Sequence, residues 1–208
     1  MVVMARPKRQ GVRRSEMVSA ATTAITKRGM TGLRIKDVAE EAGLSAGLVS
    51  YYYPSLEDLL VEVHEHAVDR FYRRRHDAVQ DLADPVERLR TTVRLGIPDA
   101  ADDPLCTVLY ELHLHASRNA THSALLSTLF DLEVSLYSTV LEIGRSQGVF
   151  TPSMPIEEIA RTAVSLEDAY GLHIIARNRR IEPWTARNSV LRYLDTVLSC
   201  SIAEFTPD

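Results

Sequence analysis

The spacing of apolar residues constrains the fold of this chain more than any other feature. From about residue 14 onward, apolar side chains recur every three or four positions, which is the period of an α-helix. No stretch has the sustained apolar/polar alternation that is typical of a β-strand. The pattern therefore predicts an all-α protein.

Glycine and proline divide this pattern into about nine helices, because glycine commonly ends a helix and proline suits its first turn. Three short helices are expected first, at about 14–28, 35–42 and 46–53. Longer helices are expected at about 56–82, 85–95, 104–117, 123–147, 155–179 and 183–203. The longer helices are too apolar on one face to stand alone, so they must form a bundle.

Composition restricts the class of protein. The 208 residues are 45% hydrophobic and 25% charged, as in soluble globular proteins. No run approaches the roughly 18–20 apolar residues of a membrane-spanning helix, and the N-terminus, with Met1 and Met4 as alternative starts, has no secretory signal. The two cysteines, Cys106 and Cys200, lack metal-binding spacing. We expect a cytoplasmic protein with no membrane association and no cofactor.

Charge is distributed unevenly along the chain. Residues 1–53 hold nine Lys or Arg against four Asp or Glu, a net +5, so the remaining residues carry −9 of the total of −4. A basic segment on an acidic body is expected where one end of a protein meets a polyanion. The alternative is that the basic leader before residue 15 is a disordered tail.

The stretch GLSAG at 43–47 fits two different functions. It matches the G-x-S-x-G pattern around a hydrolase's nucleophilic serine, and it also fits the turn and second helix of a helix-turn-helix DNA reader. The nucleophilic serine requires a strand leading into it, whereas a helix precedes Gly43 here. We therefore interpret Ser45 as a helix cap and Gly43 as a turn residue, and we expect no enzymatic activity.

A longer motif surrounds this stretch. Residues 37–47 read DVAEEAGLSAG, and three tyrosines at 51–53 and SLEDLL at 55–60 follow. Together with Ala21 and Gly29, this set resembles the N-terminal part of the TetR family of bacterial transcription regulators. The resemblance implies an N-terminal basic arm and helix-turn-helix DNA-binding domain at 1–55. It also implies a ligand-binding and dimerisation domain, a helical bundle, at 56–208.

The resemblance also indicates which residues contact DNA. The start of the recognition helix, at Ser45, suits a phosphate oxygen, and Gly47 there permits close approach of the backbone to DNA. Tyrosine rings can contact a thymine methyl while their hydroxyls bond phosphates, and one of the three tyrosines is expected in the core. Tyr53 is expected to pack against the start of the long helix. The predicted DNA-binding residues are Arg34, Lys36, Ser45, Ala46, Gly47, Ser50, Tyr51 and Tyr52.

Three positions depart from the family pattern. Arg34 replaces a common Ser or Thr cap, so the cap must come from elsewhere, with Thr31 as the candidate. Ser50 replaces a common tyrosine, as in the choline-responsive branch of the family, and Leu56 replaces a common lysine. DNA affinity should then depend more on Arg34, Lys36 and the N-terminal arm.

In this family the ligand cavity lies among the helices of the C-terminal bundle, and the last two helices form the dimer interface. Polar groups beside apolar stripes, which are typical of small-molecule pockets, predict contacts to a mainly apolar effector at Tyr110, His113, Phe130, Glu133, Tyr137 and Tyr170. Small and apolar residues predict a homodimer interface at Ala163, Gly171, Ile174 and Ile175. Glu167 and Asp168 either face a cationic ligand or form a salt bridge across the dimer, and we favour the salt bridge.

The histidines raise the question of a metal site. His64 and His66, like His113 and His115, are two residues apart, which places them about 200° apart around a helix. Neither pair can therefore chelate from one face, and no histidine has an acid three residues before it, as a di-iron bundle requires. We expect no metal.

The sequence as a whole predicts a ligand-responsive transcriptional regulator. The favoured form is a repressor that binds a palindromic double-stranded DNA operator as a homodimer and is released by a small molecule. The alternative is a helical-bundle small-molecule-binding protein or enzyme without DNA function.

Overall fold

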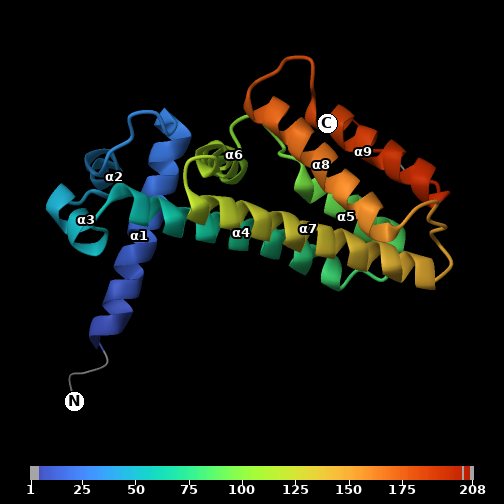
Figure 1. Cartoon of the computed structure of the whole chain (residues 1–208), viewed down its shortest axis with the longest axis horizontal. Helices are drawn as coiled ribbons and strands as arrows, with labels where there is room; N and C mark the ends of the chain where they lie inside the picture. The colour runs from blue at the N-terminus through green and yellow to red at the C-terminus, as the bar shows by residue number, and fades with distance from the viewer. Residues whose placement is uncertain (1–4, 203, 207–208) are drawn as a thin grey trace. The chain divides into compact units, whose positions relative to one another are not determined.

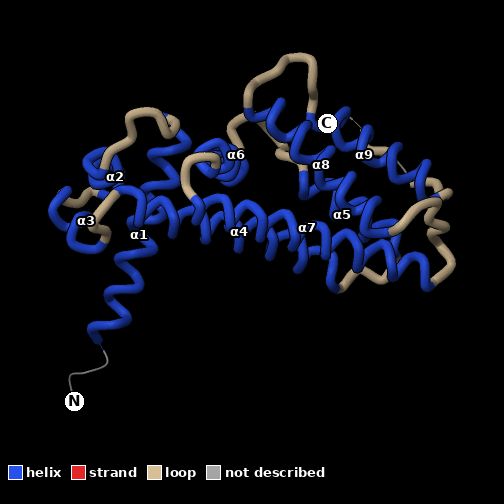
Figure 2. Tube along the Cα trace, in the orientation of Figure 1, coloured by secondary structure: helices blue, strands red, loops and turns tan. Residues whose placement is uncertain are grey.

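The computed structural model describes residues 5–202 and 204–206, with the backbone alone for residues 5–9. These residues form nine α-helices and no strand, so the predicted all-α fold is confirmed for the part of the chain that is described (Figure 1, Figure 2). The helices are α1 (Ala5–Arg28), α2 (Ile35–Ala42), α3 (Ala46–Tyr52), α4 (Leu56–Gln80), α5 (Pro85–Gly96), α6 (Pro104–Ala116), α7 (Ala120–Ser146), α8 (Ile156–Ile175) and α9 (Pro183–Leu198).

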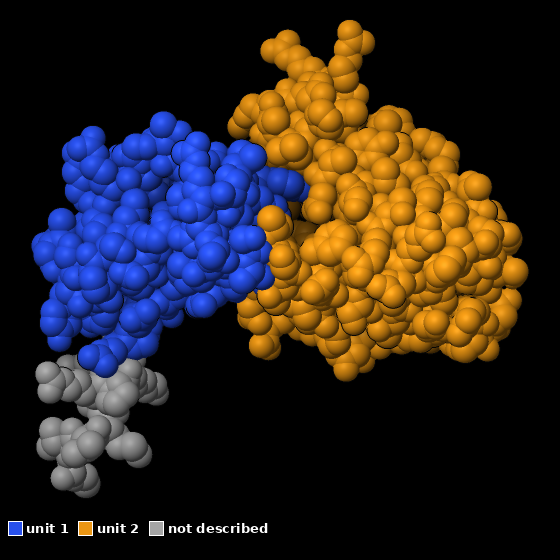
Figure 3. Space-filling view, in the orientation of Figure 1, with its two compact units in different colours: residues 1–68, 107–125 blue, residues 69–106, 126–208 orange. Residues whose placement is uncertain are grey.

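The chain divides into two compact units, and each unit is built from two separate stretches of sequence (Figure 3). Unit 1 comprises residues 1–68 and 107–125, and unit 2 comprises residues 69–106 and 126–208. The unit boundaries fall inside α4, α6 and α7. This division differs from the predicted boundary after residue 55, because it groups residues by contact rather than by order along the chain. The functional boundary stays a prediction.

In unit 1, α2 packs against both α1 and α3. The core of this group is apolar and tightly buried, with Met17, Ala21, Ile25, Val38 and Val49 all fully shielded from solvent. These residues recur at helical spacing within each element, which explains why the short helices could be located from the sequence. The packing presents α3 on the surface of unit 1.

The cap of α2 differs from the expectation. The backbone N–H of Arg34 donates to the Asp37 carboxylate at 2.9 Å, so the cap comes from the third residue of the helix. A guanidinium has no acceptor atom, so Arg34 cannot complete the reciprocal half of a capping box. The prediction that Thr31 supplies the cap is wrong.

Helix α1 begins at Ala5, well before the expected start near residue 14. Its first turn holds no acidic residue, so the usual N-terminal signal is missing. Residues 10–16 are all exposed, and they therefore lack the buried stripe that reveals a helix in a sequence. The described part of the basic leader is helical rather than a disordered tail.

In unit 2, α5, α8 and α9 pack against one another around an apolar core. The segment between α7 and α8 is tied to α9, because the backbone N–H groups of Thr151 and Ser153 donate to carbonyls of Leu198 and Val197 at 2.8 Å each. Among the described residues, α7 is the one helix long and apolar enough by composition to cross a membrane. Val134, Tyr137, Val140 and Leu141 from this helix lie in the core of unit 2, which accounts for its apolar character.

Candidate functional site

Helix α3 is positioned by a tight turn and a side-chain cap. Gly43 has a φ of 64°, in the left-handed region that glycine adopts without strain, and it ends α2. The Ser45 hydroxyl then accepts a hydrogen bond from the backbone N–H of Leu48 at 3.2 Å. The predicted turn at Gly43 and the predicted cap at Ser45 are confirmed.

The free face of α3 carries most of the predicted DNA-binding residues. Tyr51 is 72% exposed and lies edge-on to the half-buried Tyr52, with ring centroids 5.5 Å apart. Val49 alone in this helix is buried and attaches it to the unit. The exposed residues are Ser45, Ala46, Gly47, Leu48, Ser50 and Tyr51. The face therefore combines apolar aromatic surface with hydroxyl groups and a helix N-terminus.

Two basic side chains beside α3 are free to bind an anion. Arg34 and Lys36, at the start of α2, are exposed and form no ion pair with any described residue. The other basic residues described between 10 and 53 are paired with acids: Arg13 with Glu16, Arg14 with Glu62, Lys27 with Glu41, and Arg28 with Asp37 and Glu40. Counting Lys and Arg in the sequence thus overstates the positive charge that is available to bind an anion. Arg6, Lys8 and Arg9 of the predicted arm have side chains outside the described residues.

Gly47 has no structural role within the chain. A Cβ atom at this position would meet nothing within 4 Å, and its backbone conformation is not left-handed. Glycine inside a helix costs roughly 0.5–1 kcal/mol relative to alanine. The described part of the chain therefore gives no structural reason for a glycine at this position.

Tyr53 is the tyrosine of the cluster that lies in the core, at 1% exposure. Its hydroxyl donates to Glu62 of α4 at 2.9 Å, and Arg14 of α1 donates to the same carboxylate at 3.0 Å while lying over the tyrosine ring. Burial raises the pKa of Tyr53, and these two hydrogen bonds hold the pKa of Glu62 below its usual value although burial opposes the shift. The predicted packing of Tyr53 against the start of α4 is confirmed, and it links α3 to both α1 and α4.

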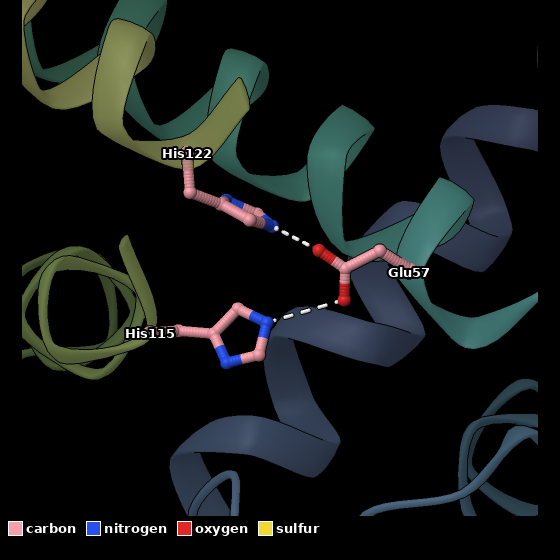
Figure 4. A group of neighbouring side chains, drawn as sticks. All are labelled: Glu57, His115 and His122. Atoms are coloured by element: carbon pink, nitrogen blue, oxygen red, sulfur yellow. Dashed lines mark hydrogen bonds and ion pairs between the residues drawn. The ribbon is translucent and has the colours of Figure 1, made fainter. Parts of the chain in front are cut away.

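Unit 1 also holds a histidine cluster that was missed at the sequence level. Glu57 of α4 lies 3.1 Å from Nε2 of His115 and 3.0 Å from Nε2 of His122 (Figure 4). Ligand atoms of these three residues lie within 4.8 Å of one another, so they form a group able to hold a metal ion. The expectation of no metal site considered pairs on one helix, whereas these residues come from three helices. Spacing along the sequence carries no signal for such a group.

Two further histidines lie beside this group. Burial lowers the pKa of His64 to about 3 and that of His113 to about 4, so both rings are neutral at pH 7. The ring of His64 stacks on that of His122 with centroids 5.1 Å apart. The centroid of His113 lies 6.0 Å from that of His64.

The predicted effector contacts are divided between the two units. Tyr110 and His113 of α6 belong to unit 1, where their rings lie edge-on with centroids 5.8 Å apart. The other four, Phe130, Glu133, Tyr137 and Tyr170, belong to unit 2. Of these, Phe130 and Tyr170 are half-buried against the core and keep exposed ring surface.

Glu133 and Tyr137 both contact a buried arginine, Arg75, whose burial was not predicted from the sequence. Arg75 of α4 is completely buried and pairs with the carboxylates of Glu133 and, at 2.8 Å, Glu167. It also donates to the backbone carbonyl of Thr92 at 3.0 Å, and the Tyr137 hydroxyl donates to Glu167. Because Arg75 lies in the run YRRRH at 72–76, it is indistinguishable in the sequence from a solvated basic surface.

This network holds two carboxylates against one cation. Burial raises the pKa of Glu133 to about 8 and that of Glu167 to about 7, and it raises the pKa of Asp168 to about 6. The two carboxylates in turn raise the pKa of Arg75 although burial opposes the shift. The favoured interpretation of Glu167, a salt bridge across a dimer, is wrong, because its carboxylate is 2% exposed and pairs with Arg75 of the same chain.

Three of the four predicted dimer contacts are core residues of the single chain. Ala163 is fully buried, Ile174 is 4% exposed and Gly171 is buried, so none of the three offers a surface to a partner. Ile175 is half-buried. Leu172 on α8 and Trp184 on α9 are instead 44% and 40% exposed, so an interface on these helices would have to use the neighbouring face. The predicted stripe of small and apolar residues on α8 exists, but it packs against the chain's own core.

Comparison with known proteins accounts for both parts of the chain. Residues 17–63 match the family described as "Bacterial regulatory proteins, tetR family", and residues 96–178 match the "Tetracyclin repressor-like, C-terminal domain". The helix-turn-helix-type transcriptional regulator YfiR of Bacillus subtilis is 30% identical over 75% of this chain and 77% of its own length. The helix-turn-helix-type transcriptional repressor NicS of Pseudomonas putida is 30% identical over 66% of this chain and 65% of its own length.

A solved structure has the same fold. The crystal structure of a transcriptional regulator from Saccharomonospora viridis, in complex with choline, superimposes with a TM-score of 0.81 over 89% of this chain and 96% of its own, at 23% identity. At that identity the likeness shows the fold alone. The sequence matches over residues 17–63 and 96–178, together with the match to YfiR, carry the assignment: the chain belongs to the TetR family of bacterial transcriptional regulators.

Proposed function

We propose that this protein is a repressor that binds an inverted-repeat DNA operator as a homodimer and is released when a mainly apolar small molecule binds. The protein acts in the cytoplasm, by binding rather than by catalysis. The named relatives are transcriptional regulators and repressors, which supports a cytoplasmic location and a function in binding rather than catalysis.

The face of α3 is the observation that carries this proposal. It offers a capped helix N-terminus, the exposed Tyr51 beside the half-buried Tyr52, and two unpaired cations nearby. Backbone N–H groups at a helix start and free guanidinium or ammonium groups are the usual ligands of DNA phosphates. Gly47 in the first turn of α3 lets the DNA backbone approach where a side chain would intervene. The proposed DNA contacts are Arg34, Lys36, Ser45, Ala46, Gly47, Ser50, Tyr51 and Tyr52.

Dimerisation follows from the way in which helix-turn-helix proteins read DNA. Two recognition helices on one face of the duplex must be separated by roughly 34–36 Å or a multiple of it, which requires two copies of the chain and a palindromic site. Exposed apolar side chains on α8 and α9, Leu172 and Trp184, support a dimer surface there. Ile175 extends that surface as a half-buried residue.

The effector would release the protein from DNA by acting through α4, which runs without interruption from unit 1 into unit 2. Tyr53 and Glu62 attach the end of α3 to this helix, so a shift of α4 would move the recognition helix. The effector can act only if it binds more tightly to the arrangement that cannot bind DNA than to the arrangement that can. Each tenfold loss of operator affinity requires a difference of about 1.4 kcal/mol between these two binding free energies. Phe130 and Tyr170 are proposed contacts that lie half-buried against the core of unit 2, and Tyr110, His113, Glu133 and Tyr137 complete the set.

The experiment is the selection of binding sites from a random pool of double-stranded DNA, followed by footprinting. We expect one inverted repeat protected on one face of the duplex. The matched control is Gly47→Glu, which places a carboxylate against phosphate and should recover no sequence. An unmodified protein that enriches no sequence above the starting pool would contradict the proposal. Titration of the selected complex with metabolites, choline among them, then identifies the effector.

A further inference from the structure

The side chains of Glu57, His115 and His122 converge from three helices on one point in unit 1 (Figure 4). Glu57 lies in the first turn of α4, His115 in the last turn of α6, and His122 near the start of α7. One carboxylate oxygen lies 3.1 Å from His115 Nε2, and the other lies 3.0 Å from His122 Nε2. Four donors at 2.0–2.1 Å from a tetrahedral zinc ion lie about 3.3 Å from one another. The two distances between a histidine nitrogen and the carboxylate are therefore near the spacing that an ion requires, and the three ligand atoms as a set lie within 4.8 Å of one another.

The protonation of the neighbouring ring fits a ligand role for His122. Nδ1 of His122 lies 2.8 Å from Nδ1 of His64, so the Nδ1–H of one ring must donate a hydrogen bond to the Nδ1 lone pair of the other. When His122 donates, its Nε2 is left with a lone pair that faces the Glu57 carboxylate. A ligating histidine characteristically donates its other ring N–H to a second residue, which fixes its orientation, and His64 occupies that place.

Burial and access also distinguish this group from a surface ion pair. His122 is completely buried, and its Nε2 makes no aligned hydrogen bond with a described residue in spite of its short distance to Glu57. Glu57 and His115, on the other side, line an open pocket of about 510 Å³ together with Met30, Leu60 and Glu111. An ion that enters from the pocket would therefore reach a buried nitrogen that faces the Glu57 carboxylate at 3.0 Å.

The supporting residues hold the ligands in place without an ion. Asn119, in the loop between α6 and α7, donates from its side chain to Glu57. The carbonyl oxygen of the same side chain accepts from the backbone N–H of Thr121 at 2.8 Å, which fixes the start of α7. The loop that carries His122 is thus oriented toward Glu57 by its own hydrogen bonds.

We propose that Glu57, His115 and His122 form a binding site for one divalent transition-metal ion of the zinc class, with His64 as the positioning residue behind His122. Two imidazoles and one carboxylate suit Zn²⁺, Co²⁺, Ni²⁺ or Fe²⁺ rather than Mg²⁺ or Ca²⁺, which prefer oxygen ligands. Three protein ligands leave a further coordination position open toward the pocket. The ion would fasten α6 and α7 to the first turn of α4.

The test uses the full-length protein without an affinity tag, freed of metal by a chelator and titrated with Zn²⁺ and Co²⁺. We expect one equivalent of either ion per chain, visible absorption bands of four- or five-coordinate Co²⁺, and a higher thermal unfolding temperature with metal than without it. Glu57→Gln and His115→Ala should each weaken binding by more than tenfold. The matched control is His66→Ala, an exposed histidine on the same helix as Glu57, which should bind like the parent.

His64→Gln keeps a hydrogen-bonding group beside His122 and tests the positioning role. It should weaken binding by about 10–100-fold, as substitutions behind metal ligands do. The metal-free thermal unfolding of each variant shows whether it is folded. Fewer than one equivalent bound by the folded parent, or parental affinity in both Glu57→Gln and His115→Ala, would overturn the proposal. None of these measurements uses DNA, so the result is independent of the proposed repressor function.

Discussion

At residue 47, α3 contains a glycine that the fold does not require, because open space surrounds the position of its missing side chain. We predict that Gly47→Ala raises the free energy of unfolding by roughly 0.5–1 kcal/mol, since alanine loses less backbone entropy in a helix. The same change should weaken operator binding by at least about tenfold, or about 1.4 kcal/mol, because a methyl group separates α3 from the DNA backbone. Denaturant unfolding and a gel-shift titration measure the two effects.

Thr139→Ala is the control, since Thr139 is exposed on α7 in unit 2 and alanine likewise suits a helix better than the residue it replaces. It should stabilise the protein and leave operator affinity unchanged. If Gly47→Ala keeps full affinity, the close approach of DNA to this residue is refuted.

Individual basic residues should differ in their contribution to the salt dependence of binding. Arg34→Ala and Lys36→Ala should each make the slope of log K against log salt less negative by about 0.9, because each loses one phosphate contact. Lys27→Ala should leave the slope unchanged, since Lys27 already pairs with Glu41 at 2.8 Å. Operator titrations at several salt concentrations give the slopes, and a slope unaltered by both of the first two substitutions would argue against phosphate contacts at α2.

Among the elements, α4, α7 and α8 meet at a buried charge network with a measurable pH signature. In the folded state the pKa is about 8 for Glu133 and about 7 for Glu167, both above their unfolded value. The folded protein therefore binds more protons than the unfolded chain, and stability falls as pH rises toward the folded pKa values. Between pH 6.5 and 8 we expect the free energy of unfolding to fall, by at most about 1.4 kcal/mol per pH unit for each proton.

Glu133→Gln tests the origin of this fall. The amide keeps the shape of the side chain and leaves Arg75 paired with Glu167 alone, so the fall over this pH range should become shallower. Denaturant unfolding at pH 6.5 and 8 compares the two proteins. The buried histidines do not interfere, because their lowered pKa values affect stability below pH 6.5. Equal slopes in the parent and the variant would show that Glu133 holds no proton in the folded protein.

The predictability of each element depended on whether its signal was local. Local start and stop signals predicted the bounds of most helices to within a few residues. One example is Asp84 before Pro85, since the Asp84 carboxylate caps α5 in the structure. The first turns of α1 have neither a cap nor a buried stripe, so they were missed.

The candidate sites followed the same rule. The DNA-binding face could be predicted because its residues are adjacent in sequence and resemble a known family. Arg75 pairs with Glu133 and Glu167, and Glu57 meets His115 and His122, only because the fold brings distant segments together. Three of the four predicted dimer contacts, Ala163, Gly171 and Ile174, lie in the chain's own core, because an apolar stripe does not reveal whether it faces that core or a partner.

For the molecule as a whole, the proposed repressor requires a dimer. Leu172→Glu places a charge on an apolar residue that is 44% exposed on α8, and we expect it to give monomers that no longer protect an operator. Val149→Glu, at a similarly exposed apolar residue between α7 and α8, is the control and should stay dimeric. Sedimentation velocity and footprinting report the two properties. A dimeric Leu172→Glu protein would move the interface to another surface.

The two-stretch construction of unit 1 has a consequence for how the protein comes apart. The backbone N–H of Met30 donates to Glu111 at 3.2 Å, and His64 bonds His122, so the second stretch supplies partners to the first. No single peptide-bond cleavage can then release this unit intact, because residues 107–125 are joined to the rest of the chain on both sides. Limited proteolysis should therefore nick loops such as 97–103 without liberating a DNA-binding fragment, and the nicked halves should stay associated through a sizing column until denaturant is added.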